Sequence, residues 1–498
     1  MRRLGCQIGR AASRFKHHDH GGLTVPLALA LPVLFGFGML TIDAGRFFNL
    51  QTSLQAGADA FALAAAAELD GRPDSLVRAE RAVSRLVDND QRFGAGQDSL
   101  DRSAISVRFL RSLPAADGAP IALANVTADP LRASFVEVAI RPVVLDNLFA
   151  AAASAVTGTM QTSATAVAGF DSVAYNVTPL FMCNPFEGSE TTLFVAARDP
   201  SFRLRQIAMK SKGSQYGSGI YGYLEPAYGN GGAAVKEALA IDKPKGCYKQ
   251  NGVELQTGNI ASTAEAMNVR FDLYEGSFSG KKGDSAYRPA RNVRKGFTGA
   301  SCNPSVSYDV AESPTHAANL NKALGLPRDG CFYTGNCTFG GTAMGGRIGD
   351  SLWDFQAYWD RTYGTGYPNG WSNANRPSRY EVYRYEIDSE LTQNYTARAA
   401  SKEKGAPMCY AGGSSTLDDE PDRRTFVGAI IDCQAAEAAG QFNGSSGGVI
   451  PVTAYARFFL TEPMDKADGT IWAEMVELVE PGTAAARNII RDSVQLHR

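Results

Sequence analysis

The sequence predicts an α+β protein with one N-terminal membrane-spanning helix followed by two folded domains. Three observations predict this fold class. An uncharged stretch lies near the N-terminus, its helical apolar pattern continues past the first charged residues, and helix-like and strand-like periodicities alternate through the rest of the chain. With 498 residues the chain is too long for a single core, so two domains after the helix are expected.

The uncharged stretch 21–42 is long enough to cross a bilayer, since a span needs about 20 mostly apolar residues. A cleaved signal peptide is the alternative, but its apolar region is about 7–15 residues long. The sequence Ile42-Asp43-Ala44 also lacks the small residue that cleavage requires at its first position. We therefore expect a retained transmembrane helix over residues 21–46. Residues 1–20 then form a cytoplasmic basic leader, which carries Arg2, Arg3, Arg10, Arg14 and Lys16.

The helix is expected to continue beyond the membrane into the first domain, residues 47–175. Its apolar residues recur at every third or fourth position, which is typical of one buried helix face; they are Phe47, Leu50, Leu54, Ala58, Phe61 and Ala65. We expect this face to pack against strands at 105–109 and 135–144. The other predicted elements of the domain are helices at 75–90 and 146–156, the second with Asp146 as N-cap, and a strand at 162–168.

The second domain, residues 176–498, is rich in Gly, Tyr and Cys and is predicted to be a larger α+β unit with an antiparallel sheet. The stretch 213–232 contains many glycines and is expected to be a loop. The predicted helices are 233–241, 260–269 and 351–359. The predicted strands are 380–387, 425–432, 452–460 and 470–479.

The N-terminal motifs resemble those of a known family. They are Leu31-Pro-Val-Leu34, Ile42-Asp-Ala-Gly-Arg46, Leu54-Gln-Ala-Gly-Ala-Asp-Ala60 and Ala62-Leu-Ala-Ala-Ala-Ala-Glu-Leu69. This order is similar to that of TadG-like (TadE/TadG family) proteins of bacterial tight-adherence, or Flp (type IVb), pilus assembly systems. The resemblance implies an inner-membrane protein with a large periplasmic part, and the basic flank predicts that its N-terminus is cytoplasmic. It also implies a non-catalytic role, with other pilus-assembly proteins as partners. The helix packed on a small sheet makes the first domain pilin-like in plan, which is an analogy of fold alone.

Two related patterns are incomplete in this chain. The motif of processed pilins is a glycine followed by a run with glutamate at its fifth position. In this chain the fifth residue after Gly22 is Leu27, and the fifth after Gly21 is Pro26. A von Willebrand type A metal site needs Asp-x-Ser-x-Ser, and the segment from Asp101 to Ile105 lacks the second serine. Neither a polymerising pilin nor that metal site is therefore expected.

Cysteine usage agrees with export to an oxidising compartment. Cys6 precedes the anchor and should be a free thiol, while seven cysteines follow it. No pair has the C-x-x-C spacing of a zinc site, so disulfides are favoured over metal. The candidates are Cys183, Cys247, Cys302, Cys331, Cys337, Cys409 and Cys433. Spacing leaves the connectivity open, although Cys331 with Cys337 would close a short loop and Cys409 with Cys433 a longer one.

No constellation of catalytic, cofactor-binding or metal-binding residues is evident, and no cofactor is expected. Histidine, the commonest general base, is represented in the body of the chain only by His316. A net charge of −2 gives no reason to expect nucleic acid as a partner.

Three other stretches each have two interpretations. The acidic residues 418–422 indicate either a Ca²⁺ site or a surface loop paired with Arg423 and Arg424. The basic stretch 281–295 indicates either a contact for an anionic partner or a solvated loop. The dense aromatic residues of 353–385 indicate either an interface or a core.

The leading functional hypothesis is a membrane-anchored, non-catalytic component of a tight-adherence pilus that acts by binding or anchoring. The alternatives are a tethered envelope enzyme or ligand-binding protein with its site in residues 178–498, and a minor pilus subunit or adhesin. A homo-oligomer is compatible with each of these.

Overall fold

The chain forms two compact units, Met1–Asp171 with Ser493–Arg498, and Ser172–Asp492. The computed structural model describes residues 24–497 apart from 71–72, 89–91, 94–97, 100, 115–118, 131–132, 147–158, 190, 212–216, 218, 250–251, 257–259, 261, 295–324, 340–346, 365, 393–404, 414–416, 418–421, 443–449, 465 and 481–483. Each unit has its own hydrophobic core.

The first unit is organised by α2 (Thr24–Ala66), a single helix of 43 residues. It contains both the predicted membrane span and the predicted buried tail, so the two form one continuous helix, with Pro32 inside it. Within the described residues, α2 is the one helix long and apolar enough to cross a membrane, and none of its most apolar window is buried. The helix therefore passes from an uncovered apolar segment into a packed one.

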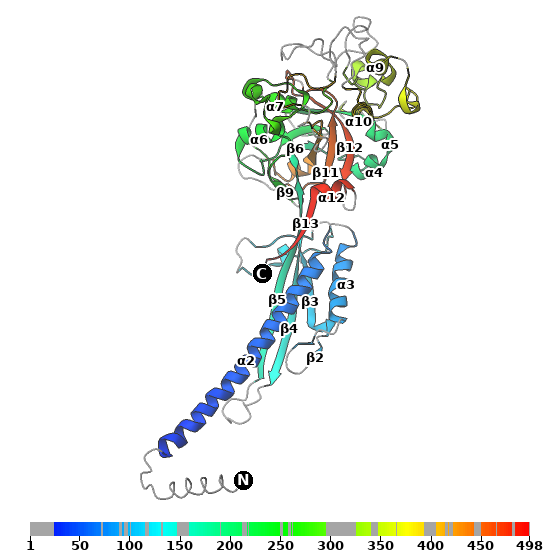
Figure 1. Ribbon diagram of the computed structural model, residues 1–498. Helices are drawn as coiled ribbons and strands as arrows, with labels where there is room; N and C mark the ends of the chain where they lie inside the picture. The colour runs from blue at the N-terminus through cyan, green and yellow to red at the C-terminus, as the bar shows by residue number, and fades with distance from the viewer. Residues whose placement is uncertain are drawn as a thin grey trace, which may run out of the picture. The chain divides into compact units, whose positions relative to one another are not determined.

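A sheet lies beside the second half of α2 (Figure 1). Its strands follow the order β13-β5-β4-β3, and neighbours β3, β4 and β5 pair antiparallel. The unit's elements are α3 (Ser75–Asp88), β1 (Arg92–Phe93), β2 (Asp98–Ser99), β3 (Ile105–Leu110), β4 (Phe135–Asp146), β5 (Thr159–Tyr175) and β13 (Ile490–Leu496). The predicted strands at 105–109, 135–144 and 162–168 and the helix at 75–90 are thus confirmed.

The predicted buried face of α2 is confirmed as well. Leu54 and Ala58 are fully buried and share one hydrophobic cluster with Val136, Val138 and Ile140 of β4. Leu50, Phe61 and Ala65 belong to the same cluster, whereas Phe47, at the membrane end of the face, is only half-buried. The α-helical repeat therefore faces the sheet as the sequence pattern indicates.

Both ends of this sheet differ from the expectation. Asp146 ends β4 and pairs with Thr159, so it is a strand residue rather than a helix N-cap. The rest of the helix predicted at 146–156 lies outside the described residues. At the C-terminus, residues 493–498 belong to the first unit, where the His497 amide donates to the Val167 carbonyl at 2.8 Å. Their expected place in the second domain is therefore wrong, because a strand pattern does not identify the sheet that the strand joins.

The second unit contains a closed six-stranded barrel in the order β10-β11-β12-β7-β8-β6. Four neighbouring pairs are antiparallel, and two pairs, β10 with β6 and β7 with β8, are parallel. The strands are β6 (Val177–Cys183), β7 (Gln206–Ser211), β8 (Ile220–Tyr223), β10 (Thr425–Ile431), β11 (Ala454–Leu460) and β12 (Ile471–Val479). The three strands predicted near the C-terminus are thus confirmed as β10, β11 and β12.

Short helices surround this barrel (Figure 1). They are α4 (Leu193–Arg198), α5 (Pro200–Arg203), α6 (Gly231–Ala240), α7 (Thr263–Asn268), α8 (Gly330–Thr334), α9 (Phe355–Thr362), α10 (Arg379–Asp388), α11 (Cys433–Ala438) and α12 (Ala484–Ile489). The short strand β9 (Cys247–Lys249) pairs with the last residues of β5. The helices predicted at 233–241 and 260–269 correspond to α6 and α7, and the one predicted from residue 351 begins at Phe355 as α9.

The strand predicted at 380–387 is wrong, because these residues form α10. Ser378 caps the helix through a reciprocal hydrogen-bonded box with Glu381. The buried residues of α10 follow a helical spacing, but two of them, Arg379 and Glu386, are charged. Because charged residues are normally exposed, Arg379 and Glu386 do not count toward an apolar helix face. The remaining apolar and polar residues then alternate as they do in a strand. The expected loop at 213–232 is also wrong in part, since it contains β8 and the start of α6.

The packing of α2 on the sheet is tested by Leu54→Asp. The variant places an unpaired charge in the cluster and should destabilise the first unit by about 3–5 kcal/mol. Ala56→Asp is the matched control, because Ala56 is exposed on the same helix. Hydrogen exchange of the β4 amides in detergent-solubilised protein should accelerate only in Leu54→Asp. Unchanged exchange would mean that the helix does not depend on the sheet.

Candidate functional site

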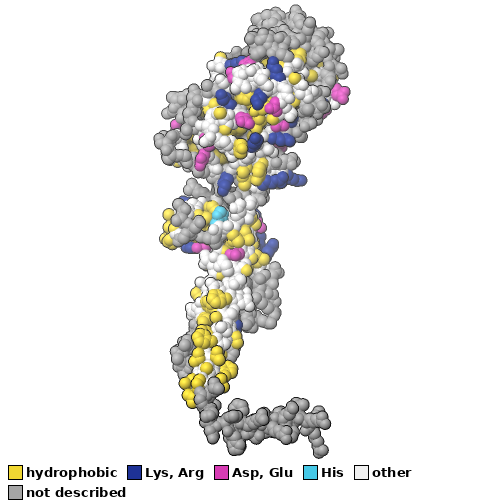
Figure 2. Space-filling model, turned by 60° about the vertical axis from the view of Figure 1, so that its left-hand side comes forward, with side chains coloured by type: hydrophobic (Ala, Val, Ile, Leu, Met, Phe, Trp, Pro, Cys, Tyr) yellow, Lys and Arg dark blue, Asp and Glu magenta, His cyan; other side chains and the backbone are white. Residues whose placement is uncertain are grey.

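The N-terminal half of α2 is an extended apolar surface that the first unit leaves uncovered. Its large side chains are more than two-fifths exposed; they are Val25, Leu27, Leu29, Leu31, Val33, Leu34, Phe35, Phe37, Leu40 and Ile42. Figure 2 shows this continuous hydrophobic surface along the N-terminal part of the chain. A patch of this length in water would be very costly, whereas a bilayer accommodates it. This surface is the candidate site of membrane attachment.

The first charged residues of α2 follow this surface directly. Asp43 is buried, and its carboxylate lies 3.5 Å from the guanidinium of Arg46, one turn further along the helix. Pairing lowers the cost of holding two charges where the helix leaves the apolar environment. The helix can therefore end its membrane-embedded part without interrupting its backbone hydrogen bonds.

Two disulfides hold the second unit. Cys183, at the end of β6, bonds to Cys433, at the start of α11, across 250 residues of sequence. Cys331 bonds to Cys337, as the short spacing indicated. The pairing of Cys409 with Cys433 is therefore wrong, since proximity in sequence does not decide proximity in the barrel. Cys247 is exposed and Cys409 half-buried, while Cys302 and Cys6 lie outside the described residues.

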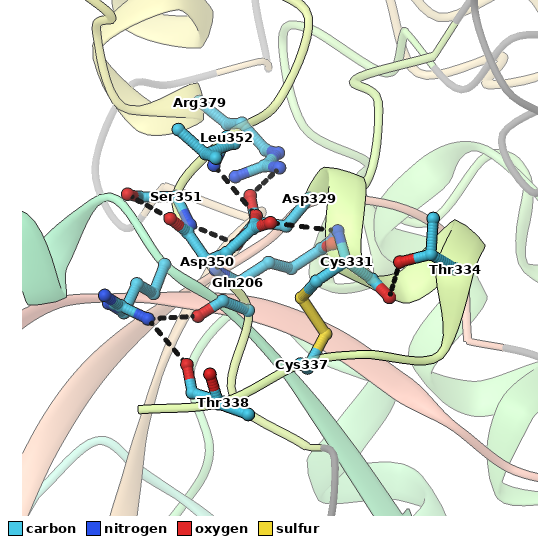
Figure 3. The surroundings of a disulfide bond; sticks show 12 residues. Gln206, Asp329, Cys331, Thr334, Cys337, Thr338, Asp350, Ser351, Leu352 and Arg379 are labelled. Atoms are coloured by element: carbon cyan, nitrogen blue, oxygen red, sulfur yellow. Dashed lines mark hydrogen bonds and ion pairs between the residues drawn. A yellow bond between two sulfur atoms is a disulfide. The ribbon is translucent and has the colours of Figure 1, made fainter. Parts of the chain in front are cut away.

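Asp329, just before the disulfide-bonded helix α8, receives a set of converging hydrogen bonds (Figure 3). Its Oδ2 accepts from the backbone amides of Gln206 and Ser351, both at 3.0 Å. Its Oδ1 accepts from Nη2 of Arg379 at 2.7 Å. The carboxylate is fully buried, so these partners replace the water it loses on folding.

Two further features fix the position of Asp329. A Cβ added at Gly349 would lie 1.8 Å from its Oδ2, so only glycine allows this close approach. The neighbouring Asp350 accepts from the Cys331 amide at 3.1 Å, which links the disulfide-bonded turn to the same loop. The Cys331–Cys337 bond thus lies where it restrains the residues that hold Asp329 (Figure 3).

Arg379 connects Asp329 to Glu474 of β12. Its Nη1 donates to Oε1 of Glu474 at 2.6 Å, and its Nε donates to the Pro327 carbonyl at 2.7 Å. All three charged side chains are almost completely buried. Burial raises the pKa of Glu474 to about 7, with a further contribution from Asp329, although Arg379 acts in the opposite direction. One arginine therefore balances two buried carboxyl groups.

A second buried network surrounds Glu386 of α10. Its carboxylate accepts from the hydroxyls of Tyr358 and Tyr363 and from the amide of Asn292. The guanidinium of Arg294 lies 3.5 Å away. Burial, followed by the charge of Glu386, raises the pKa of both tyrosines above their usual value. With both carboxylate oxygens engaged, Glu386 is suited to holding α9 and α10 together rather than to accepting a proton from a substrate.

The charged stretches at 281–295 and 418–424 are surface features only in part. Arg288 and Arg294 are buried, so these two side chains belong neither to a solvated loop nor to a surface for an anionic partner, whereas Lys281 and Lys282 are partly exposed. Arg423 is also buried and donates to the carbonyls of Arg288, Ile241 and Ala240. Asp422 is buried and accepts from the Tyr383 hydroxyl at 2.6 Å, so this part is not a surface loop. Residues 418–420 and Lys295 lie outside the described residues.

These buried guanidinium groups donate hydrogen bonds mainly to backbone carbonyls. Arg424 donates to the carbonyls of Leu460 and Thr461, and Arg270 donates to those of Leu239 and Thr425. Burial lowers the pKa of Arg270 to about 10 and that of Arg423 well below its usual value. The arginines therefore connect loops to the barrel through carbonyl groups, and no ligand is needed to explain them.

The aromatic stretch is mostly core. Trp353, Tyr358, Trp359 and Tyr383 are buried in one cluster with Phe355 and Phe459. The remaining members are half-buried and pack against it; they are Tyr363, Tyr367, Trp371, Tyr380 and Tyr385. Packing in the core therefore accounts for these aromatic side chains, and an interface is not needed to explain them.

Within the residues that the structure describes, no three His, Cys, Asp or Glu side chains are grouped so as to hold a metal ion. His316 lies outside those residues. The grouping of Asp329, Arg379 and Glu474 is not predictable from the sequence. They are separated by 50 and 95 residues along the chain, and no local motif connects them. Only the start of α10 carries a recognisable sequence signal. Ser378 and Glu381 have the three-residue spacing of a helix capping box.

Comparison with known families gives a match for the N-terminal segment. Residues 21–68 match a family described as putative Flp pilus-assembly TadE/G-like. No curated protein and no solved structure matches the chain. The matched range coincides with α2 from the apolar surface to the end of the packed face. The resemblance of this segment to TadG-like proteins is thus confirmed, and it supports involvement in Flp pilus assembly.

The buried Glu474 predicts a pH dependence of stability. Because its pKa is raised in the folded state, the unfolded chain loses this proton at lower pH than the folded chain. Its contribution to the free energy of unfolding is complete below about pH 4.5 and falls by about 3 kcal/mol as the pH rises through 7.

Glu474→Gln should remove this component, since glutamine does not titrate. Asp422, whose pKa burial also raises, remains in both proteins and cancels in the comparison. Urea unfolding of the second unit, followed by tryptophan fluorescence, measures the difference between the two proteins. Parallel pH profiles for them would show that folding does not raise the pKa of Glu474.

Proposed function

We propose that this protein is a membrane-anchored, non-catalytic component of a tight-adherence (Flp) pilus assembly apparatus. The observation that carries the proposal is the coincidence of the family match, residues 21–68, with one uninterrupted helix that is uncovered at one end and packed at the other. Such a helix holds a folded unit at a fixed place on a membrane. The role of the protein is then to anchor or bind other assembly proteins.

The proposed topology has a cytoplasmic N-terminus and a periplasmic bulk. Five basic residues precede the apolar stretch, which favours retention of that end in the cytoplasm. Both disulfides lie after the helix, and disulfides persist in oxidising compartments such as the periplasm. Inner-membrane location and partners among the pilus-assembly proteins complete the proposal.

The buried charges of the second unit support a structural role for it. Asp329, Glu386 and Glu474 each accept several hydrogen bonds from the surrounding chain. A catalytic acid or base needs a position from which it can reach a substrate. An envelope enzyme or ligand-binding protein would need a different group of side chains to carry its chemistry. A minor pilus subunit would instead be cut near Gly21 or Gly22, which N-terminal sequencing of the mature protein reveals.

Genetic complementation tests the proposed function. Deletion of the coding segment should abolish surface pili, and the wild-type chain should restore them. A chain carrying Leu34→Asp and Phe35→Asp should fail, because each aspartate near the centre of a span costs about 3 kcal/mol of insertion free energy. Electron microscopy of surface pili and fractionation of the protein give the readouts.

The matched control is Val77→Asp, which changes an exposed apolar residue of α3 outside the span. It should restore piliation as well as the wild type does. Normal piliation in the deletion strain would overturn the proposed function.

A further inference from the structure

The first unit leaves apolar side chains uncovered beyond the membrane-spanning stretch. Along α2 the exposed large apolar residues run from Val25 to Ile42, and the last described one is Phe48, which is 63% exposed. On β4, Val144 is 52% exposed. Both residues lie outside the uncharged stretch 21–42, so the membrane span alone does not account for them.

The register of α2 on the sheet shows which residues of the helix and of the β4–β5 pair lie at the same height. Nε2 of Gln55 donates to the Thr165 carbonyl at 3.1 Å, which fixes one point of contact between α2 and β5. From Gln55 back to Asp43 the helix descends by about 18 Å. From Thr165 back to Thr159 the strand descends by about 20 Å. Because α2 and β5 run in the same direction (Figure 1), Thr159 lies near the level of Asp43.

The end of the β4–β5 ladder therefore reaches the point where α2 leaves its apolar stretch. Asp146 is the partner of Thr159, and Leu145 is the partner of Met160. Leu145 packs partly against the core of the unit, whereas the adjacent Val144 points to the opposite face of the sheet, as strand alternation requires. The sheet thus presents an uncovered apolar residue next to the membrane.

A basic residue on the sheet lies further from the proposed span than Val144. Arg141 is exposed on β4, three residues before Val144 and therefore about 10 Å further out, whereas Arg46 lies on α2 between Asp43 and Phe48. An apolar surface bordered by arginine is complementary to a bilayer surface, whose acyl chains are bordered by phosphate groups. A protein partner would not need this order of apolar and basic residues along β4.

We propose that this end of the first unit rests on the bilayer that α2 crosses. Val144 contacts lipid at the boundary of the acyl region, Phe48 and Arg46 lie where the acyl chains meet the headgroups, and Arg141 lies at the level of the phosphates. The inference rests on the membrane anchoring proposed above and adds a second membrane contact to it. Two contacts, the span and the end of the sheet, restrict the tilt of the first unit relative to the membrane.

Fluorescence quenching by brominated lipid tests this contact in the full-length chain reconstituted into nanodiscs. Tryptophan replaces one residue at a time, in Phe48→Trp and Val144→Trp, and the emission of the parent protein is subtracted. Phe37→Trp, within the span, is the positive control. Ser106→Trp is the negative control, since Ser106 is exposed and its partner Ala139 pairs with Thr165, at the level of Gln55.

Lipids brominated near the headgroup end of the acyl chain should quench Phe48→Trp and Val144→Trp to an extent comparable with Phe37→Trp. Ser106→Trp should keep its emission. If Val144→Trp behaves like Ser106→Trp while Phe37→Trp is quenched, the sheet does not touch the bilayer and the inference is overturned. If Phe37→Trp is also unquenched, the anchoring itself fails, so the two failures are distinguishable.

The role of the arginines is tested by lipid charge. Nanodiscs of phosphatidylcholine are compared with nanodiscs that also contain phosphatidylglycerol, at low ionic strength. The anionic lipid should increase the quenching of Val144→Trp, and Arg141→Gln should reduce this increase. Equal quenching in both lipids would remove the arginines from the proposed contact.

Discussion

The structure of the first unit depends on the packing of α2 against its sheet. The helix has to satisfy two environments along one axis, because its first half is uncovered and apolar while its second half is buried only on one face. Since every backbone group inside a helix is paired within the helix, the change of environment requires no break in the chain. The side chains alone decide where the helix leaves the membrane, and Leu54 and Ala58 decide which face meets the sheet.

The second unit depends on a different kind of constraint. Its barrel brings together strands from residues 177–223 and 425–479, and parallel pairing of β6 with β10 joins these parts. The Cys183–Cys433 bond lies at the end of this parallel pair. Around the barrel, buried arginines donate to carbonyls and carboxylates of loops that are remote in sequence. Replacing one partner would leave a buried charge uncompensated, which is costly.

The sequence predicted those parts of the fold whose pattern is local. Residues of α2 repeat at every third or fourth position, and β3, β4, β10, β11 and β12 have apolar residues that a periodicity can reveal. It failed for α10, because the buried Arg379 and Glu386 hide the helical pattern. It also failed for the pairing of Cys433, for the sheet that β13 joins, and for the group of Asp329, Arg379 and Glu474. Each of these depends on contacts between distant residues, for which a single sequence carries no signal.

The central claim is that α2 anchors a periplasmic protein among pilus-assembly proteins. Cross-linking of intact envelopes with a reagent that does not cross the inner membrane tests it most directly, followed by purification of the chain and identification of attached proteins. The account predicts that the cross-linked species contain pilus-assembly proteins, and that the Leu34→Asp, Phe35→Asp chain loses them. Recovery of the wild-type chain without attached pilus-assembly proteins, or no reaction with the reagent, would contradict it.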